Sequence, residues 1–124
     1  MNTSWNSVWV VGGSTGLGAE LVKQFSQAGV LTYVSARSER KLKSLCDENK
    51  SAQAYPLDIT DREACVRTVS DIHQSLGTLP DLIILNAAVY SPMNVANFNI
   101  NEISAMIDVN YLGVVNMMAA LLPF

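Results

Sequence analysis

The chain has 124 residues, of which 49% are hydrophobic and 15% charged, a composition typical of one globular domain rather than a disordered chain. Its 8 basic and 11 acidic residues give a net charge of −3 without a basic cluster, which argues against nucleic-acid binding. Cys46 and Cys65 lack C-x-x-C or metal-ligand spacing, so we expect reduced thiols, no metal site and a cytoplasmic location.

No segment has the sequence pattern of a secretion signal or a membrane span. The N-terminus lacks a basic region followed by a long apolar core. The longest nearly apolar stretch, residues 111–122, is shorter than the roughly 20 residues that a bilayer requires. We therefore predict a soluble protein that does not bind membranes.

A glycine-rich turn follows the first predicted strand. The apolar run at residues 8–11 predicts a buried parallel strand, and Gly12 allows the backbone to turn sharply. Gly16 and Gly18 begin a helix whose free N–H groups and positive dipole end favour a phosphate. Two hydroxyl side chains add donors at the rim: Ser14 and Thr15. The turn therefore predicts a phosphate site, although such glycine clusters also occur in plain turns.

The first helix is predicted from Gly16 to Ala28, with Gly29 as a left-handed cap. Four apolar residues at helical spacing are expected on its buried face: Leu17, Leu21, Phe25 and Ala28. Residues 30–36 are rich in β-branched and aromatic side chains, which predicts the second strand.

The loop after the second strand bears on the choice of cofactor. Arg37 follows Gly18 by 19 residues, and no carboxylate occurs in this loop before Glu39. In dinucleotide-binding folds an acidic residue near this place binds the ribose 2′-hydroxyl, whereas an arginine accommodates a 2′-phosphate. We therefore predict that NADP(H) is preferred over NAD(H). The alternative is that Arg37 is a solvated surface charge.

The middle of the chain contains two further helices and two further strands. Residues 38–49 predict a surface helix, residues 53–57 a short third strand, and residues 61–76 a helix that stops at Gly77. Thr60 and Glu63 have the spacing of a capping box. The lone His73 has no carboxylate or thiol at metal-ligand spacing, so we expect it to be structural.

The last part of the chain repeats the strand-and-helix pattern. The apolar run at residues 82–85 predicts a fourth buried strand, after which Asn86 could bridge neighbouring strands. Residues 89–99 predict a loop, and Asn99 with Glu102 predicts the start of a long helix to about residue 122. With right-handed crossovers, the alternation predicts one α/β domain over residues 1–124. Its fold would be the first half of a Rossmann-like doubly wound parallel sheet with strand order 3-2-1-4.

Four landmarks, in order along the chain, resemble the short-chain dehydrogenase/reductase family. The first resembles T-G-x-x-x-G-x-G, with Val11 in place of Thr; the second is Leu57-Asp58-Ile59-Thr60-Asp61. The third is Asn86-Ala87-Ala88, which departs from the N-N-A-G of the family at Leu85 and Ala88. The fourth is Asn110 within Val109-Asn110-Tyr111-Leu112-Gly113. This resemblance implies an NADP(H)-dependent oxidoreductase that acts on a carbonyl or alcohol group.

The resemblance also implies a set of cofactor-binding residues: Gly12, Ser14, Thr15, Gly16, Leu17, Gly18, Arg37, Asp58, Ile59, Asn86, Ala87 and Ala88. Within this set, it implies that the Asp58 carboxylate accepts from the adenine amino group while the Ile59 N–H donates to the ring; alternatively, Asp58 orders the turn. The extra methyl of Ala88 could narrow the approach to the cofactor. Asn110 would belong to the catalytic residues; alternatively, it faces solvent or bends the helix.

The catalytic Ser and Tyr-x-x-x-Lys of the family have no counterpart in this chain. No tyrosine is followed four residues later by a lysine. We therefore expect the chain alone to be inactive, as either a fragment of a longer oxidoreductase or a short nucleotide-binding remnant. We also expect self-association, as a dimer through the helix at residues 104–122 or through residues 82–85 as an edge strand.

Overall fold

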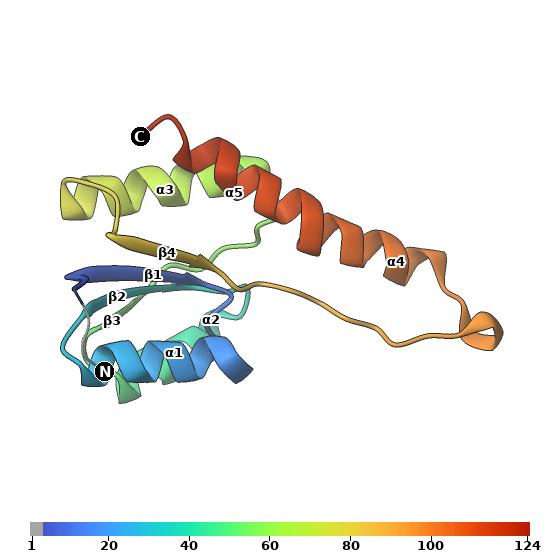
Figure 1. The fold of residues 1–124 in the computed structure, drawn as a ribbon, viewed down its shortest axis with the longest axis horizontal. Coiled ribbons are helices and arrows are strands. Elements are labelled where there is room, and N and C mark those ends of the chain that lie inside the picture. The colour runs from blue at the N-terminus through green and yellow to red at the C-terminus, as the bar shows by residue number, and fades with distance from the viewer. Residues whose placement is uncertain (1–3) are drawn as a thin grey trace.

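The computed structural model describes residues 4–124 and contains one parallel sheet between two layers of helices (Figure 1). The strand order is β3-β2-β1-β4, which confirms the predicted Rossmann-like α/β topology. The strands are β1 (Ser7–Val11), β2 (Leu31–Ser35), β3 (Ala52–Ala54) and β4 (Leu82–Leu85). β3 is shorter than expected because residues 55–57 leave regular geometry, although Tyr55 and Leu57 still donate backbone hydrogen bonds to the β2 side.

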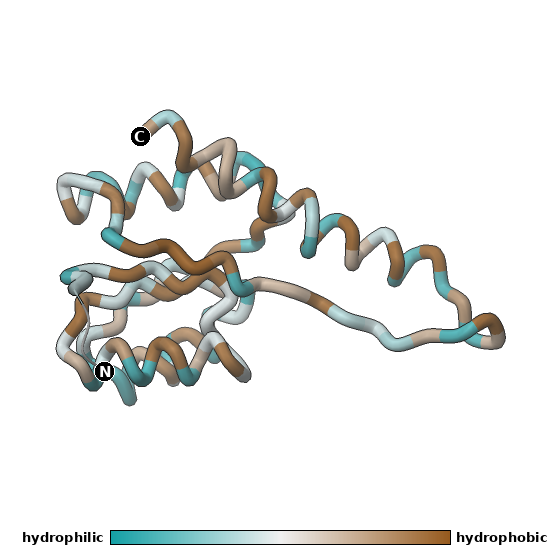
Figure 2. The backbone as a smooth tube through the Cα atoms, in the orientation of Figure 1, coloured by the Kyte–Doolittle hydropathy of each residue, from teal (hydrophilic) through white to brown (hydrophobic). Residues whose placement is uncertain are grey.

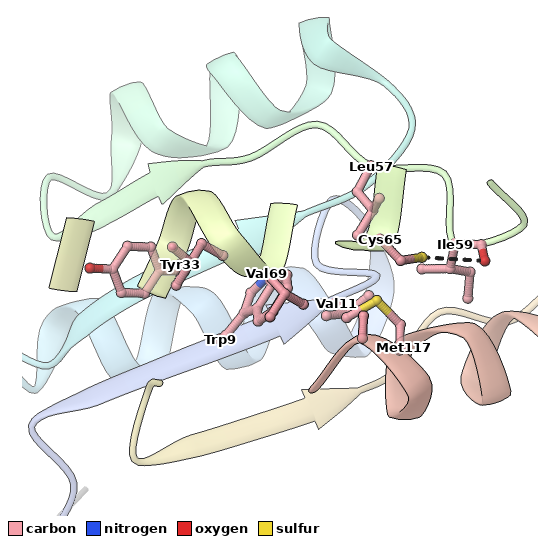
Figure 3. Packing of buried hydrophobic residues seen from close by; sticks show 10 residues of the cluster. Trp9, Val11, Tyr33, Leu57, Ile59, Cys65, Val69 and Met117 are labelled. Atoms are coloured by element: carbon pink, nitrogen blue, oxygen red, sulfur yellow. Dashed lines mark hydrogen bonds between the residues drawn. The ribbon is translucent and has the colours of Figure 1, made fainter. Parts of the chain in front are cut away.

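Helices α1 (Gly16–Gln27) and α2 (Glu39–Glu48) cover one face of the sheet. Helices α3 (Arg62–Leu76) and α5 (Val114–Leu121) cover the other face (Figure 1). The second layer is anchored by large buried side chains, including Trp9 from β1, Tyr33 from β2 and Met117 from α5 (Figure 3). The indole Nε1 of Trp9 donates to the Ser35 hydroxyl at 2.9 Å, so its polar group is satisfied inside the core.

The buried face of α1 differs from the predicted one. Leu17 is 69% exposed, whereas Gly18, Val22 and Phe25 are buried. A Cβ at Gly18 would lie 2.1 Å from the Gly12 carbonyl oxygen. Because the glycine turn packs directly on Gly18, the buried stripe begins one residue further along than the apolar spacing indicates, while Phe25 is buried as predicted. The predicted end of the helix is confirmed, since Gly29 has a φ of +76°.

The predicted capping box at α3 is wrong. The helix is capped by Asp61, whose Oδ1 accepts from the Ala64 N–H at 2.9 Å. Thr60 lies one residue before this cap position, and its hydroxyl donates instead to Asp58 Oδ1 at 2.7 Å. At the other end, Gly77 adopts a φ of +80° and closes the helix as expected.

After β4 the chain leaves the sheet and returns as one long helical stretch (Figure 1). The short 3₁₀ turn η1 (Val95–Asn97) precedes α4 (Ile100–Ile107), the π-helical turn η2 (Asp108–Gly113) and α5. Asn99 caps α4 through its side-chain oxygen, as predicted. Residues 100–121 form a helix long and apolar enough, by length and composition alone, to cross a membrane (Figure 2). The expectation from residues 111–122 underestimated this length, because α4 continues into α5.

β4 is an edge strand whose four residues are half-buried. It pairs with β1 on one side, and no described strand pairs with its other side. The prediction of a fully buried strand is therefore wrong for this chain, while the prediction of an edge at residues 82–85 is confirmed.

Candidate cofactor site

A cleft of about 630 Å³ lies beyond the carboxyl ends of the strands. Nine of the predicted cofactor-binding residues line it together: Gly12, Ser14, Thr15, Arg37, Asp58, Ile59, Asn86, Ala87 and Ala88. Gly16, Leu17 and Gly18 are not among the lining residues and form the adjoining N-terminus of α1. Open α/β sheets bind ligands at this edge, so the cleft has the position expected of a ligand site.

The glycine turn brings backbone groups close together at the floor of the cleft. Gly12 has a φ of +89°, and a Cβ there would lie 2.4 Å from the backbone of Ala87. Gly16 has a φ of +57° with nothing within 4 Å of a Cβ position, so its need for glycine is conformational. The Thr15 side chain makes no capping hydrogen bond to α1 and does not compete for its first N–H groups. These features suit an anionic group at the helix N-terminus.

The far end of the cleft is basic. Arg37, Ser38 and Lys41 line it, and Asp58 is the only carboxylate lining the cleft among residues 4–124. Lys41 was not predicted from the sequence. The sequence feature that could have indicated it is the four-residue spacing between Arg37 and Lys41. Ser38 caps α2 by accepting from the Lys41 N–H at 3.3 Å, and this cap brings both cations to the start of the helix.

Asp58 orders the turn between β3 and α3. Its Oδ1 accepts from the Thr60 N–H at 2.9 Å and from the Thr60 hydroxyl at 2.7 Å. The turn-ordering alternative is thus confirmed. It does not exclude a second role, because a carboxylate has several lone pairs and Asp58 is exposed to the cleft.

Asn86 joins the ends of β1 and β4, as predicted. Its backbone N–H donates to the Val11 carbonyl at 2.8 Å, and its Nδ2 donates to the Gly12 carbonyl at 2.8 Å. The second bond fixes the glycine turn from the β4 side. Ala88 is exposed beside it with a negative φ, so its methyl group is accommodated without backbone strain.

Asn110 lies in η2, where the helix departs from α geometry. Its Oδ1 accepts from the Val89 N–H at 2.8 Å, and its Nδ2 donates to the Val89 carbonyl at 2.7 Å. Asn110 does not line the cleft itself, but Val89 does. It therefore holds one wall of the cleft through the backbone.

The remaining polar and titratable candidates have structural surroundings. Burial raises the pKa of the Cys65 thiol to about 11, with the Asp61 and Asp58 carboxylates adding to the shift, so the thiol stays protonated at neutral pH. Burial likewise raises the pKa of Cys46. His73 packs against the Phe124 ring, with ring centroids 4.6 Å apart. Within residues 4–124, no group of three or more His, Cys, Asp or Glu side chains could hold a metal ion.

The sequence matches the family model described as short chain dehydrogenase over residues 6–124. Dehydrogenase/reductase SDR family member 7 of Mus musculus is 32% identical over 124 residues, which cover 94% of this chain and 36% of that protein. The apo form of LigD from Sphingobium sp. strain SYK-6 has a TM-score of 0.87 at 28% identity, over 95% of this chain and 52% of that chain. A metagenomic short-chain oxidoreductase solved in complex with NADP has a TM-score of 0.83 at 22% identity, over 95% and 55% of the two chains, and shows the shared fold. The chain thus spans between 36% and 55% of the length of these proteins.

Proposed function

The chain belongs to the short chain dehydrogenase family, and from that premise we propose that it forms the NADP(H)-binding part of an oxidoreductase acting on a carbonyl or alcohol group. The observation that carries the proposal is the pair of cations at the basic end of the cleft, Arg37 and Lys41, in the same cavity as the glycine turn. A 2′-phosphate carries negative charge that a ribose hydroxyl lacks, and an arginine guanidinium binds it with two donors at once.

The chain's own residues fit the rest of such a cofactor. The glycine turn and the N-terminus of α1 would receive the pyrophosphate. A Cβ added at Gly12 or Gly18 would collide with backbone atoms, and the space around a Cβ position at Gly16 is open within 4 Å. Asp58 and Ile59 would receive the adenine, and Asn86 to Ala88 the ribose of the nicotinamide end. When bound, the cofactor supplies the hydride; these residues bind and orient it.

A second candidate function is nucleotide binding without turnover. No tyrosine of the chain is followed four residues later by a lysine, so it lacks the arrangement that donates a proton in the family it belongs to. In this form the chain would be an inactive, self-associating nucleotide-binding protein. For either candidate we propose a cytoplasmic location, because two free cysteines are typical of proteins in a reducing compartment.

The test of the proposed function is a comparison of NADPH and NADH affinities by titration calorimetry. We expect NADPH to bind roughly tenfold to a hundredfold more tightly, the range that hydrogen bonds to a charged group provide. Arg37→Asp should remove most of this preference. Lys50→Asp makes the same change of charge in the turn before β3, at the opposite edge of the sheet, and should preserve the preference.

Equal affinities for the two cofactors in the unsubstituted chain would contradict the assignment of Arg37 and Lys41 to a 2′-phosphate. Failure to bind either cofactor at millimolar concentration would contradict the proposed function itself.

A further inference from the structure

The Ile59 peptide is held by residues of the helical layer formed by α3 and α5. Asn116 of α5, 57 residues away in sequence, donates its Nδ2 to the Ile59 carbonyl at 2.9 Å. The Cys65 thiol donates to the same oxygen at 3.6 Å (Figure 3). The Ile59 side chain is buried against Gly113, where a Cβ would lie 2.5 Å from Ile59 Cδ1. The backbone and the side chain of Ile59 are therefore both fixed by the η2–α5 helix.

The other end of the same peptide group reaches the cleft. The carbonyl of Ile59 and the N–H of Thr60 belong to one planar unit. That N–H donates to Asp58 Oδ1 at 2.9 Å. A continuous chain of hydrogen bonds thus runs from the Asn116 amide, through one peptide group, to the Asp58 carboxylate that lines the cleft. Bonds linked through a peptide group in this way strengthen one another.

Asn116 also interrupts an otherwise apolar surface. It is the one polar residue in the stretch from Tyr111 to Leu122, and its side chain is partly buried. Its neighbour Met117 and nearby Ala120 pack in the core. An apolar residue at position 116 would suit this packing but would leave the Ile59 carbonyl without its amide donor, which costs free energy. The bond to the Ile59 carbonyl therefore accounts for a polar side chain at position 116.

We propose that Asn116 is a positioning residue for the adenine end of the cleft, acting through the Ile59–Thr60 peptide on the Asp58 carboxylate. This inference rests on the proposed function, because it takes adenine as the group that Asp58 receives. In this proposal α5 affects how well the cleft distinguishes adenine from other bases. Asn116 sets the direction in which the Asp58 carboxylate points, and Asp58 makes the contact with the base. Asn110 holds Val89 from the same helical stretch, so the helix positions both ends of the cleft.

The experiment compares NADPH with its hypoxanthine analogue, in which the adenine amino group is replaced by a carbonyl oxygen. A carboxylate that accepts from the amino group should give NADPH an advantage of roughly tenfold in affinity. Asn116→Leu keeps the branched shape of the side chain at a somewhat larger volume and removes the donor, so the advantage should fall below about threefold. A loss of packing alone would weaken both ligands equally and leave their ratio unchanged. Asn101→Leu, at an exposed position of the same helical stretch, should preserve the ratio.

A second readout tests the bond chain without any cofactor. Amide hydrogen exchange at Thr60 should be roughly tenfold faster in Asn116→Leu than in the unsubstituted chain or in Asn101→Leu, because the peptide is no longer fixed at its carbonyl end. If Asn116→Leu does not fold, Asn116→Asp, which has the same shape but no N–H donor, takes its place with Asn101→Asp as the control.

The outcomes separate the two proposals. Faster Thr60 exchange in a chain that binds no NADPH would support the positioning role and overturn the proposed function. Normal NADPH binding with an unchanged affinity ratio and unchanged Thr60 exchange in the Asn116 variants would overturn the positioning role alone.

Discussion

Asn110 uses both ends of its amide on the backbone of one residue, Val89. These two bonds satisfy the N–H and the carbonyl of Val89 at the point where the chain leaves β4 and enters the loop to α4. The π-helical geometry of η2 accompanies this contact, and π turns of this kind occur frequently at functional sites. The residue therefore has a structural role in this chain, while the catalytic role implied by the family stays a prediction.

Asn110→Ala should destabilise the fold by about 1 kcal/mol, the lower end of what two hydrogen bonds contribute, because the side chain is exposed. Urea denaturation monitored by circular dichroism measures this difference. Asn101→Ala removes an exposed amide from the same helical stretch and should change the stability by less than about 0.5 kcal/mol. Equal denaturation midpoints for the two variants would show that the Val89 contact contributes no stability.

At the scale of elements, η2 and α5 present a large apolar surface. Tyr111, Leu112, Val115 and Met118 are all exposed, although the opposite side of α5 packs on α3. The helix cannot bury all its apolar residues against one face of one sheet, since they surround most of its circumference. A second copy of the chain, packed through the same helix about a two-fold axis, would cover this surface.

We predict that the chain self-associates with a dissociation constant in roughly the micromolar range. Light scattering after size exclusion, over a hundredfold range of concentration, measures the molecular mass. Val115→Glu, at a position 47% exposed on α5, should shift the equilibrium towards monomer. Val66→Glu introduces the same charge at a position 53% exposed on α3 and should have no such effect.

A dimer that survives Val115→Glu would place the contact at the open edge of β4 instead of the helix, since that edge carries unpaired backbone groups. A monomer at every concentration would contradict both arrangements.

At the scale of the whole molecule, the basic residues are unevenly distributed along the chain. All the lysines and arginines occur between Lys23 and Arg67, and the remainder of the chain carries five carboxylates and no lysine or arginine. This basic part contributes Arg37 and Lys41 to the lining of the cleft. The apolar helix at residues 100–121 carries Glu102 and Asp108, and so lacks the cations by which amphipathic helices bind anionic lipid surfaces. That the chain does not bind membranes stays a prediction.

The 124 residues should bind NADPH without reducing carbonyl compounds. The reaction needs a proton donor beside the substrate, and the chain has no tyrosine paired with a lysine four residues later. NADPH absorbance, followed with a panel of ketones and aldehydes, measures the turnover. Carbonyl-dependent oxidation that remains through purification to homogeneity, and that tracks the protein peak, would contradict the prediction.

Apolar runs and β-branched residues predict the four strands, with β3 displaced and shorter than expected, and the alternation with helices predicts their order. The glycine turn is likewise a local feature, because the positive φ angles of Gly12 and Gly16 belong to the turn itself and favour glycine there. Nine predicted residues meet in one cleft for the same reason: the carboxyl ends of parallel strands share one edge. The strands and turns that carry these residues are encoded in short stretches of sequence, and the parallel topology then brings their ends together.

Contacts between elements were decided by the tertiary structure. Gly18 is buried because the turn folds onto it, and Lys41 reaches the cleft because α2 begins beside Arg37. The Asn116 bond to Ile59 spans 57 residues, and no local pattern indicates it. The sequence by itself therefore determined which elements form and in what order, whereas the side chains that join them depend on the distances that packing sets between remote segments.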